Sequence, residues 1–362
     1  MLKYTKVSSH PRIFRSLTGM TPQAFDRLLP AFQKAYEQAL DEADARRDSP
    51  RQRRRGAGRK PVLRTPEDKL FFILLYFRLY PTQEVLGFLF GFGQPQANYW
   101  VHRLTPILNA ALGYEMQLPA RKPFTLQQVL KACPELQFIL DGTERTIQRL
   151  KDRQRQKDYY SGRKKKHTVK NVLIIHKGSG RILGLSSTYP GRRHDKGVAD
   201  EWGISFPSGS HLWGDTGFYG YAPEGVIVHL PKKKPKKGEL SSEEKAQNRI
   251  ISKERIGVEH SIGKVKNFRI VREIYRNRRH SFEDIVMETA CGMVICFWLV
   301  GWQKSLNGLP PFEGGEKKVE DSRPFLPDLE DSLTQVATLS HQDKINLREQ
   351  SQILPSEVSR ND

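Results

Sequence analysis

The chain has 362 residues, with 60 lysines and arginines against 40 aspartates and glutamates, so its formal net charge is +20. This length allows two or three domains with sizeable cores. The positive excess predicts a polyanionic partner, most simply nucleic acid. The excess lies in residues 1–312, whereas residues 313–362 are net acidic. We expect an acidic tail, residues 305–362, to be mostly disordered.

Cysteine content and hydropathy bear on the compartment. Three cysteines, Cys133, Cys291 and Cys296, are too few for a disulfide framework or a zinc ligand set, and they indicate a reducing environment. The opening sequence MLKYTKVSSHPRIF lacks the apolar run of a signal peptide. The most apolar segment, residues 290–302, is too short to cross a bilayer. We therefore expect a cytoplasmic, nucleoid-associated protein with no membrane partner.

The first two predicted units are a helical segment over residues 1–45 and a basic arm over residues 46–64. Thr21 and Pro22 are typical of a helix start and begin a periodic apolar pattern. The arm contains RRDSPRQRRRGAGRKP, which is either a solvated linker or an arm that lies in a DNA minor groove. As an arm, its DNA contacts would be Arg53, Arg54, Arg55, Arg59 and Lys60.

Residues 65–125 predict a helical DNA-binding unit. One helix begins at TPED, a second begins at Thr82, and a third begins near Pro95 after the turn GFGQP. Short helices joined by a glycine turn fit a helix-turn-helix, although an ordinary helical bundle gives the same spacing. In a helix-turn-helix, Gln94, Gln96 and Asn98 would lie where the recognition helix reads base edges.

Residues 134–304 predict an α/β catalytic domain. The residues KGSG at 177–180 indicate a hairpin between two of its strands. The expected strands are 136–141, 168–176, 181–188, 211–215 and 226–230, and the expected helices are 196–203, 245–267 and 282–303.

Two of these strands end on an acid. Asp141 follows the apolar run FIL and precedes Gly142, and Asp215 follows HLWG. In each case the residue either forms part of a turn or places a metal ligand on a strand end. Glu259 is a third candidate, on a helix, where a solvated salt-bridge partner is the ordinary role. Together, three such carboxylates are the parts of a two-metal phosphoryl-transfer site, and their oxygens suit Mg²⁺ or Mn²⁺.

The ordered set of motifs resembles one family. The segments RRGAGRKPVLRTPEDKLFFILLYFRLYPTQEVLGFLFG, DGTERTIQRLKDRQRQKDYYSGRKKKHTVKN, YPGRRHDKG, GDTGFYG and ERIGVEHSIGKVKNFR cover about residues 15–303. In this order they resemble the IS5-type insertion-sequence transposases and the related Harbinger-like nucleases of the DDE superfamily. The resemblance implies an RNase H-like catalytic domain behind an all-α, helix-turn-helix domain. It assigns the catalytic and metal-binding roles to Asp141, Asp215 and Glu259, with two Mg²⁺ or Mn²⁺ ions.

Cations near these acids are the next candidates. The spacing of Arg255, Glu259 and Lys266 matches part of a Tyr-Arg-Glu-Lys signature found in related transposases, but Ser252 stands at the tyrosine position. Arg255 and Lys266 would hold DNA phosphates beside the metals, or pair with Glu259 and neighbouring acids. A second basic run would follow the DNA backbone, unless it serves solubility alone: Lys164, Lys165 and Lys166.

Four further residues are weaker candidates. Asp195 either approaches the metals or caps a helix that starts at Lys196. Glu144 lies three residues after Asp141 and would point away from it along an extended strand. His194 and His260 are not expected to be ligands, because oxygen suits these metals better.

The sequence thus predicts a DNA transposase that binds the terminal inverted repeats of its element, cleaves with metal ions and transfers the strand to target DNA. Because two element ends must be joined, we expect at least a homodimer. The alternatives are an inactive, domesticated DNA-binding regulator and a nuclease that cuts without joining.

Overall fold

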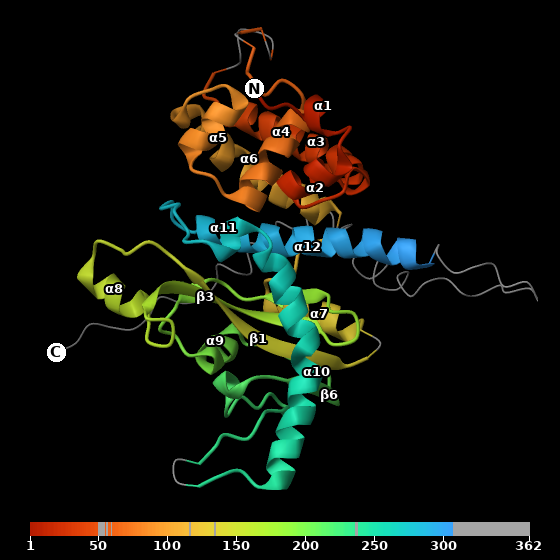
Figure 1. The fold of residues 1–362 in the computed structure, drawn as a ribbon, viewed down its shortest axis with the longest axis vertical. Helices are drawn as coiled ribbons and strands as arrows, with labels where there is room; N and C mark the ends of the chain where they lie inside the picture. The colour runs from red at the N-terminus through yellow and green to blue at the C-terminus, as the bar shows by residue number, and fades with distance from the viewer. Residues whose placement is uncertain are drawn as a thin grey trace, which may run out of the picture.

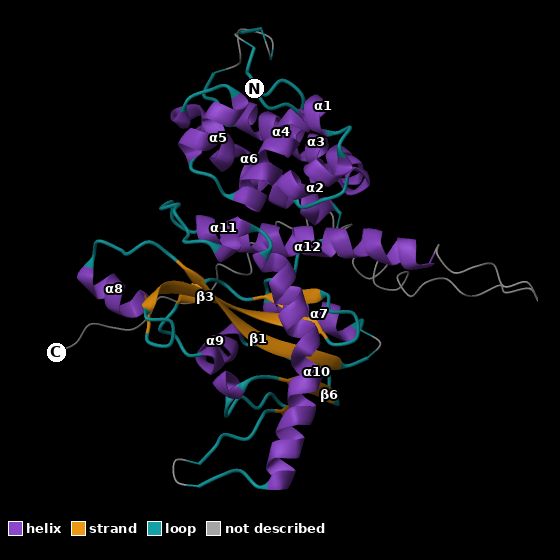
Figure 2. Ribbon diagram, in the orientation of Figure 1, coloured by secondary structure: helices purple, strands orange, loops and turns teal. Residues whose placement is uncertain are grey.

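The computed structural model describes an all-α N-terminal body above a mixed α/β body (Figure 1). It describes residues 1–306 except 50–54, 56, 59, 116, 134, 236 and 237. Figure 2 shows that the strands all belong to the lower body, where helices cover them. The fold class predicted from the sequence is confirmed: a helix-turn-helix region precedes a mixed α/β domain consistent with the RNase H-like type.

The N-terminal body is built around aromatic residues. Phe14, Phe25 and Phe71 are fully buried, and the ring of Phe14 contacts the other two. Thr21 accepts a hydrogen bond from the amide of Ala24 and so starts the longest helix of this body, as its sequence predicts. The helices before the basic arm are α1 (Tyr4–Val7), α2 (Pro11–Thr18) and α3 (Pro22–Ala45).

The helix-turn-helix consists of α4 (Pro66–Leu79), α5 (Gln83–Phe90) and α6 (Gln94–Tyr114). Gly91 ends α5 in the left-handed region, at a φ of 78°, which favours glycine. Gly87 is needed for a different reason: a Cβ there would lie 2.4 Å from the carbonyl oxygen of Phe92. These two glycines permit the tight turn that sets α6 against α5.

A mixed sheet forms the centre of the lower body. Its main path has the order β2-β3-β1-β6-β7, and β4 and β5 both pair with β3. Strand β1 is antiparallel to β3 and parallel to β6. The strands are β1 (Gln137–Thr146), β2 (Tyr160–Ser161), β3 (Lys166–His176), β4 (Ile182–Leu185), β5 (Tyr189–Pro190), β6 (Ser210–Trp213) and β7 (Val226–His229).

Helices pack on both faces of this sheet. Alternate residues of β1 belong to different cores: Ile139 packs in the cluster that contains α10 and α12, and Phe138 packs in the cluster that contains α7 and α9. The helices of this body are α7 (Pro123–Lys131), α8 (Arg153–Tyr159), α9 (Asp195–Trp202), α10 (Ser242–Lys266), α11 (Arg269–Arg272) and α12 (Phe282–Leu306), with a 3₁₀ turn η1 (Thr216–Phe218).

The two bodies are packed together through α11 and α12 (Figure 1). Arg276 donates hydrogen bonds to the carbonyls of Tyr80 and Pro81, and Asn109 on α6 bonds to Thr289 on α12. One hydrophobic cluster runs from the N-terminal helices into the sheet. The helix-turn-helix is therefore held in a defined position against the α/β body.

Most predicted elements are present, and the differences include one at the site itself. The hairpin at 177–180 is confirmed by the antiparallel pairing of β3 with β4. The prediction that the first strand ends at Asp141 is wrong, because β1 continues to Thr146 along β3. Helices α7, α8 and α11 lie where no helix was predicted. None of the described helices combines the length and apolar character that a bilayer-spanning segment needs.

Candidate active site

The parallel pairing of β1 with β6 brings two aspartates to one place. The last paired residues are Ile139 and Trp213, and Asp141 and Asp215 each come two residues later. Because side chains alternate along a strand, Asp141 shares the sheet face of Ile139, toward α10. The turn interpretation of Asp141 is wrong, since β1 runs through it. Asp215 does begin a turn, because its Oδ1 accepts a hydrogen bond from the amide of Gly217 at 2.8 Å.

Asp141 lies in an environment that disfavours its charge. Its side chain is 19% exposed, and burial raises the pKa of Asp141 to about 6, against the opposing effect of Arg255. The negative charges of Asp215 and Asp195 raise this pKa further. Arg255 Nη2 on α10 donates a hydrogen bond to Asp141 Oδ1 at 3.1 Å. A cation at this position therefore has a physical reason to bind.

Asp195 lies beside Asp215, as the third acid of this group. A Cβ built on Gly217 would lie 2.7 Å from Asp195 Oδ2 and 2.8 Å from Asp215 Oδ1, so Gly217 leaves the space between the two carboxylates open. The predicted capping of a helix starting at Lys196 is wrong: α9 begins at Asp195 itself, with His194 as its N-cap residue.

A buried cation already balances Asp195. Lys170 Nζ lies 2.8 Å from Asp195 Oδ1 and 3.5 Å from Glu144 Oε1. Lys170 is directly opposite Glu144 in the β1–β3 register, on the face away from Asp141. Glu144 thus points away from Asp141 as expected, into an ion pair within the domain.

The structure does not bring Glu259 into this group. Its side chain is exposed on α10, and among the described residues it makes no hydrogen bond or ion pair. It lies one helical turn after Arg255, which reaches Asp141. Within the described part of the chain, no three acidic, histidine or cysteine side chains converge closely enough to enclose a metal ion.

The cations predicted to contact DNA are placed around these acids. Burial lowers the pKa of Lys266, Lys164 lowers it further, and Asp141 opposes both effects, so Lys266 lies within electrostatic reach of both residues. Lys164, Lys165 and Lys166 are exposed at the turn that leads into β3. His194 and His260 are both exposed on the surface.

The start of α6 presents one free amide and two that are engaged. Gln94 and Asn98 both donate hydrogen bonds to Gln83 Oε1 on α5, at 2.8 Å and 3.1 Å. Gln96 is exposed, and its side chain makes no hydrogen bond to the other described residues. The bonds to Gln83 fix the position of α6 relative to α5, while Gln96 faces solvent.

The basic arm lies partly outside the described residues, and this applies to Arg53, Arg54 and Arg59. Arg55 folds back onto α3, where Nη1 lies 2.6 Å from Asp41 and Nε lies 2.6 Å from Asp44. Lys60 is exposed. Arg55 must therefore exchange two carboxylates for a phosphate if it contacts DNA.

The acid group fits a divalent cation by its donor chemistry. Asp141 and Asp215 supply hard oxygen atoms, and the repulsion between them is opposed locally by Arg255. Beside them, Gly217 leaves the space between Asp215 and Asp195 open. A Mg²⁺ or Mn²⁺ ion bound by Asp141 and Asp215 would offset the burial of the Asp141 charge, which is the main cause of its raised pKa, and would relieve the repulsion from Asp215.

Two buried cations behind the site were not predicted. Lys170 interrupts the apolar strand KHTVKNVLIIH, and such a lysine in a strand indicates a buried ion pair. Arg145 is also buried, and donates hydrogen bonds to Asn171 Oδ1 and to the carbonyl of Glu283 at the start of α12. Arg145 therefore ties β1 to α12 behind the acids.

Comparison with known proteins gives a consistent assignment. Residues 140–294 match a family model described as DDE superfamily endonuclease, and residues 61–113 match one described as the helix-turn-helix of DDE superfamily endonuclease. A protein of Microchaete diplosiphon described as a probable transposase for insertion sequence element IS702 is 29% identical over 272 residues, which cover 75% of this chain and 89% of the relative. Asp141, Asp215 and Glu259 all lie within the endonuclease match, and α4 to α6 lie within the other up to residue 113. Residues 140–294 are thus assigned to the DDE superfamily of endonucleases, and residues 61–113 to the helix-turn-helix of that superfamily.

Proposed function

We propose that this protein is an insertion-sequence transposase that cleaves DNA at the ends of its element and joins the freed ends to target DNA. The observation that carries the proposal is the convergence of Asp141 and Asp215 where the parallel pairing of β1 with β6 ends, with a raised pKa at Asp141. Membership of the endonuclease superfamily supports the reaction class, and the helix-turn-helix supports a DNA substrate.

The proposed reaction has two steps. Water attacks a phosphodiester at the element end, the bond between phosphorus and the 3′ oxygen breaks, and a free 3′-hydroxyl results. That hydroxyl then attacks a phosphodiester of target DNA in line. A new bond joins the element's 3′ oxygen to the target phosphorus, and the 3′ oxygen of the upstream target nucleotide leaves. When bound, two divalent ions supply activation of the attacking oxygen and stabilisation of the leaving oxygen.

The chain's own residues bind and position the reactants. Asp141 and Asp215 would hold Mg²⁺ or Mn²⁺, and we assign Glu259 as the third carboxylate because it lies one turn from Arg255 and has no other described partner. Asp195 is not assigned as a ligand, since Lys170 already pairs with it. When a metal holds Asp141, Arg255 is free to bind a phosphate oxygen beside Lys266.

Recognition of the element end is assigned to the N-terminal body. Gln96 is the free amide at the start of α6, and it is the residue best placed to contact a base edge. The basic arm, with Arg53, Arg54, Arg59 and Lys60, would add phosphate or minor-groove contacts. Two ends must meet for joining, so we propose that the active form is at least a homodimer.

A strand-transfer assay with element-end DNA, target plasmid and Mg²⁺ tests this function. The wild-type protein should cut and join, and Asp141→Asn should do neither while it still binds the DNA. An inactive regulator would bind without cutting, and a simple nuclease would cut without joining. If Asp141→Asn cleaves as fast as wild type, the assignment of the site is wrong.

A further inference from the structure

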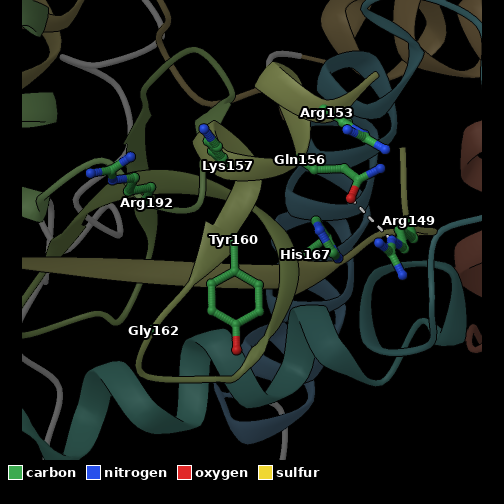
Figure 3. A pocket seen from close by; sticks show the side chains of 8 residues that line it. All are labelled: Arg149, Arg153, Gln156, Lys157, Tyr160, Gly162, His167 and Arg192. Carbon is green, nitrogen blue, oxygen red and sulfur yellow. Dashed lines mark hydrogen bonds between the residues drawn. The ribbon is translucent and has the colours of Figure 1, made fainter. Parts of the chain in front are cut away.

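A second concave site lies beside α8, apart from the acid group. It is a pocket of about 900 Å³ between α8, the turn into β3 and the segment after β5. Figure 3 shows Tyr160 with Lys157 and Arg192 on one side and Arg149 and Arg153 on the other. His167 also lines the pocket. Its ring packs edge-on against that of Tyr160, with 5.7 Å between the ring centroids. The pocket thus combines four cations with two aromatic rings.

Among the described residues, the cations of this pocket have no acidic partners. Arg149 donates to the neutral Gln156 at 3.1 Å, and within the described chain the side chains of Arg153, Lys157 and Arg192 make no ion pair with a carboxylate. All four are exposed. Clustered like charges repel one another, so an anion that neutralises them would bind favourably.

The pocket is connected to the acid group by a row of positive charges. Lys266 lies within electrostatic reach of both Asp141 and Lys164. The amide of Lys164 donates to Ser161 Oγ, next to Tyr160 and Gly162 of the pocket. A DNA strand with its scissile phosphate at Asp141 would meet Lys266, then Lys164, and then this pocket.

We propose that this pocket binds an unpaired stretch of the DNA strand that leaves the active site, with phosphates on its cations and a base stacked on Tyr160. The proposal rests on the function proposed above. Tyr160 is 43% exposed, and an exposed aromatic residue among cations is the arrangement that binds single-stranded nucleic acid without reading its sequence. A duplex keeps its bases stacked inside and would leave this ring unused.

Binding of a fluorescent oligothymidylate of about ten nucleotides, a length within the usual range for such sites, tests the proposal by fluorescence anisotropy. Arg153→Gln with Arg192→Gln should weaken binding about tenfold and make its salt dependence shallower. Tyr160→Ala should weaken it by a similar factor, whereas Tyr160→Phe, which keeps the ring, should bind like wild type.

The matched control is Lys122→Gln with Lys131→Gln, which removes the same charge around α7, at the other end of the sheet from α8 in Figure 1. This control should bind oligothymidylate like wild type. Equal weakening by the control would overturn the proposal, as would wild-type binding by the Arg153 and Arg192 variant. If the affinity of that variant for blunt duplex DNA falls by the same factor as its affinity for oligothymidylate, the single-strand assignment is overturned.

The outcomes separate this inference from the proposed function. If the Arg153 and Arg192 variant binds the oligonucleotide normally while Mg²⁺-dependent cleavage still requires Asp141, the pocket fails and the transposase function stands. If the wild-type protein shows no Mg²⁺-dependent cleavage but the variant loses oligonucleotide binding, the function fails and the pocket remains a nucleic-acid site.

Discussion

Arg255 Nη2 lies 3.1 Å from Asp141 Oδ1, so the long helix α10 reaches the central strand at a carboxylate. Both side chains are about four-fifths covered, and the pair lies next to the charges of Asp215 and Asp195. The guanidinium thus occupies a place where a metal ion would also be attracted. Metal binding and the Arg255 contact are therefore expected to compete for Asp141.

The raised pKa of Asp141 predicts a pH-dependent stability. In the metal-free folded protein this pKa is about 6, against an ordinary value of 3.8. The folded state therefore holds a proton more tightly than the unfolded state, and stability present below pH 3.8 is lost as the pH rises through about 6. Relative to Asp141→Asn, the loss should amount to about 3 kcal/mol.

The difference in melting temperature between wild type and Asp141→Asn, followed from pH 4 to pH 8 without metal, measures this effect. The melting temperature of the variant should rise relative to that of wild type as the pH increases across that range. Addition of Mg²⁺ should raise the melting temperature of wild type alone. A pH-independent difference would contradict the assigned environment of Asp141.

Glu259 is predicted to be needed for chemistry although it is exposed in this structure. Glu259→Gln should lower the Mg²⁺-dependent cleavage rate by about 10²-fold or more. It removes the third carboxylate assigned to the metal site, which stabilises the charge that develops in the transition state. Cleavage of element-end DNA measures this rate. Glu243→Gln, another exposed glutamate on α10, should cleave like wild type. Equal rates for the two variants would remove Glu259 from the site.

Gln96 is predicted to contribute to recognition of the element end. Gln96→Ala should lower discrimination between element-end DNA and an unrelated duplex by about 1–3 kcal/mol, the usual value of a specific base contact. The ratio of the two dissociation constants measures the change. Gln128→Ala on α7 is a control for the loss of an exposed glutamine. An unchanged ratio of dissociation constants for Gln96→Ala would show that Gln96 does not contribute to base recognition.

The basic arm is predicted to bind phosphates. Replacement of Arg53 and Arg54 by glutamine should weaken duplex binding and lower the slope of log K against log salt by up to about two, since each phosphate contact contributes about 0.9. Arg55 is left unchanged because it already pairs with Asp41 and Asp44. A slope equal to that of the Lys122 and Lys131 control would show that the arm makes no phosphate contact.

Sequence periodicity predicted most helices and strands, but not where each one ends or which strands pair. The strand through Asp141 was expected to stop there because its apolar pattern ends, yet β3 pairs with β1 up to Thr146 and extends it. Likewise, α8 has no buried residues, so it has no apolar stripe from which it could be recognised. Tertiary pairing, which the local pattern does not encode, decided the length of β1.

Some residues of the candidate site could be predicted from the sequence, and others could not. Asp141 and Asp215 could be found because each follows a short apolar run in the sequence, and the register of β1 with β6 places them together. The ion pair of Asp195 with Lys170 could not be found, since it joins a helix start to the middle of a distant strand. The side chain of Glu259 has no described contact that fixes it, so its assignment depends on the family resemblance and on the nearby Arg255.

Binding of Mn²⁺, followed by the loss of its free electron paramagnetic resonance signal, tests the metal site most directly. Wild type should bind Mn²⁺, and so should Asp200→Asn, which changes an exposed acid of α9. The variant with both Asp141→Asn and Asp215→Asn should leave the free signal unchanged. If that double variant binds Mn²⁺ as tightly as wild type, these two aspartates do not form the metal site.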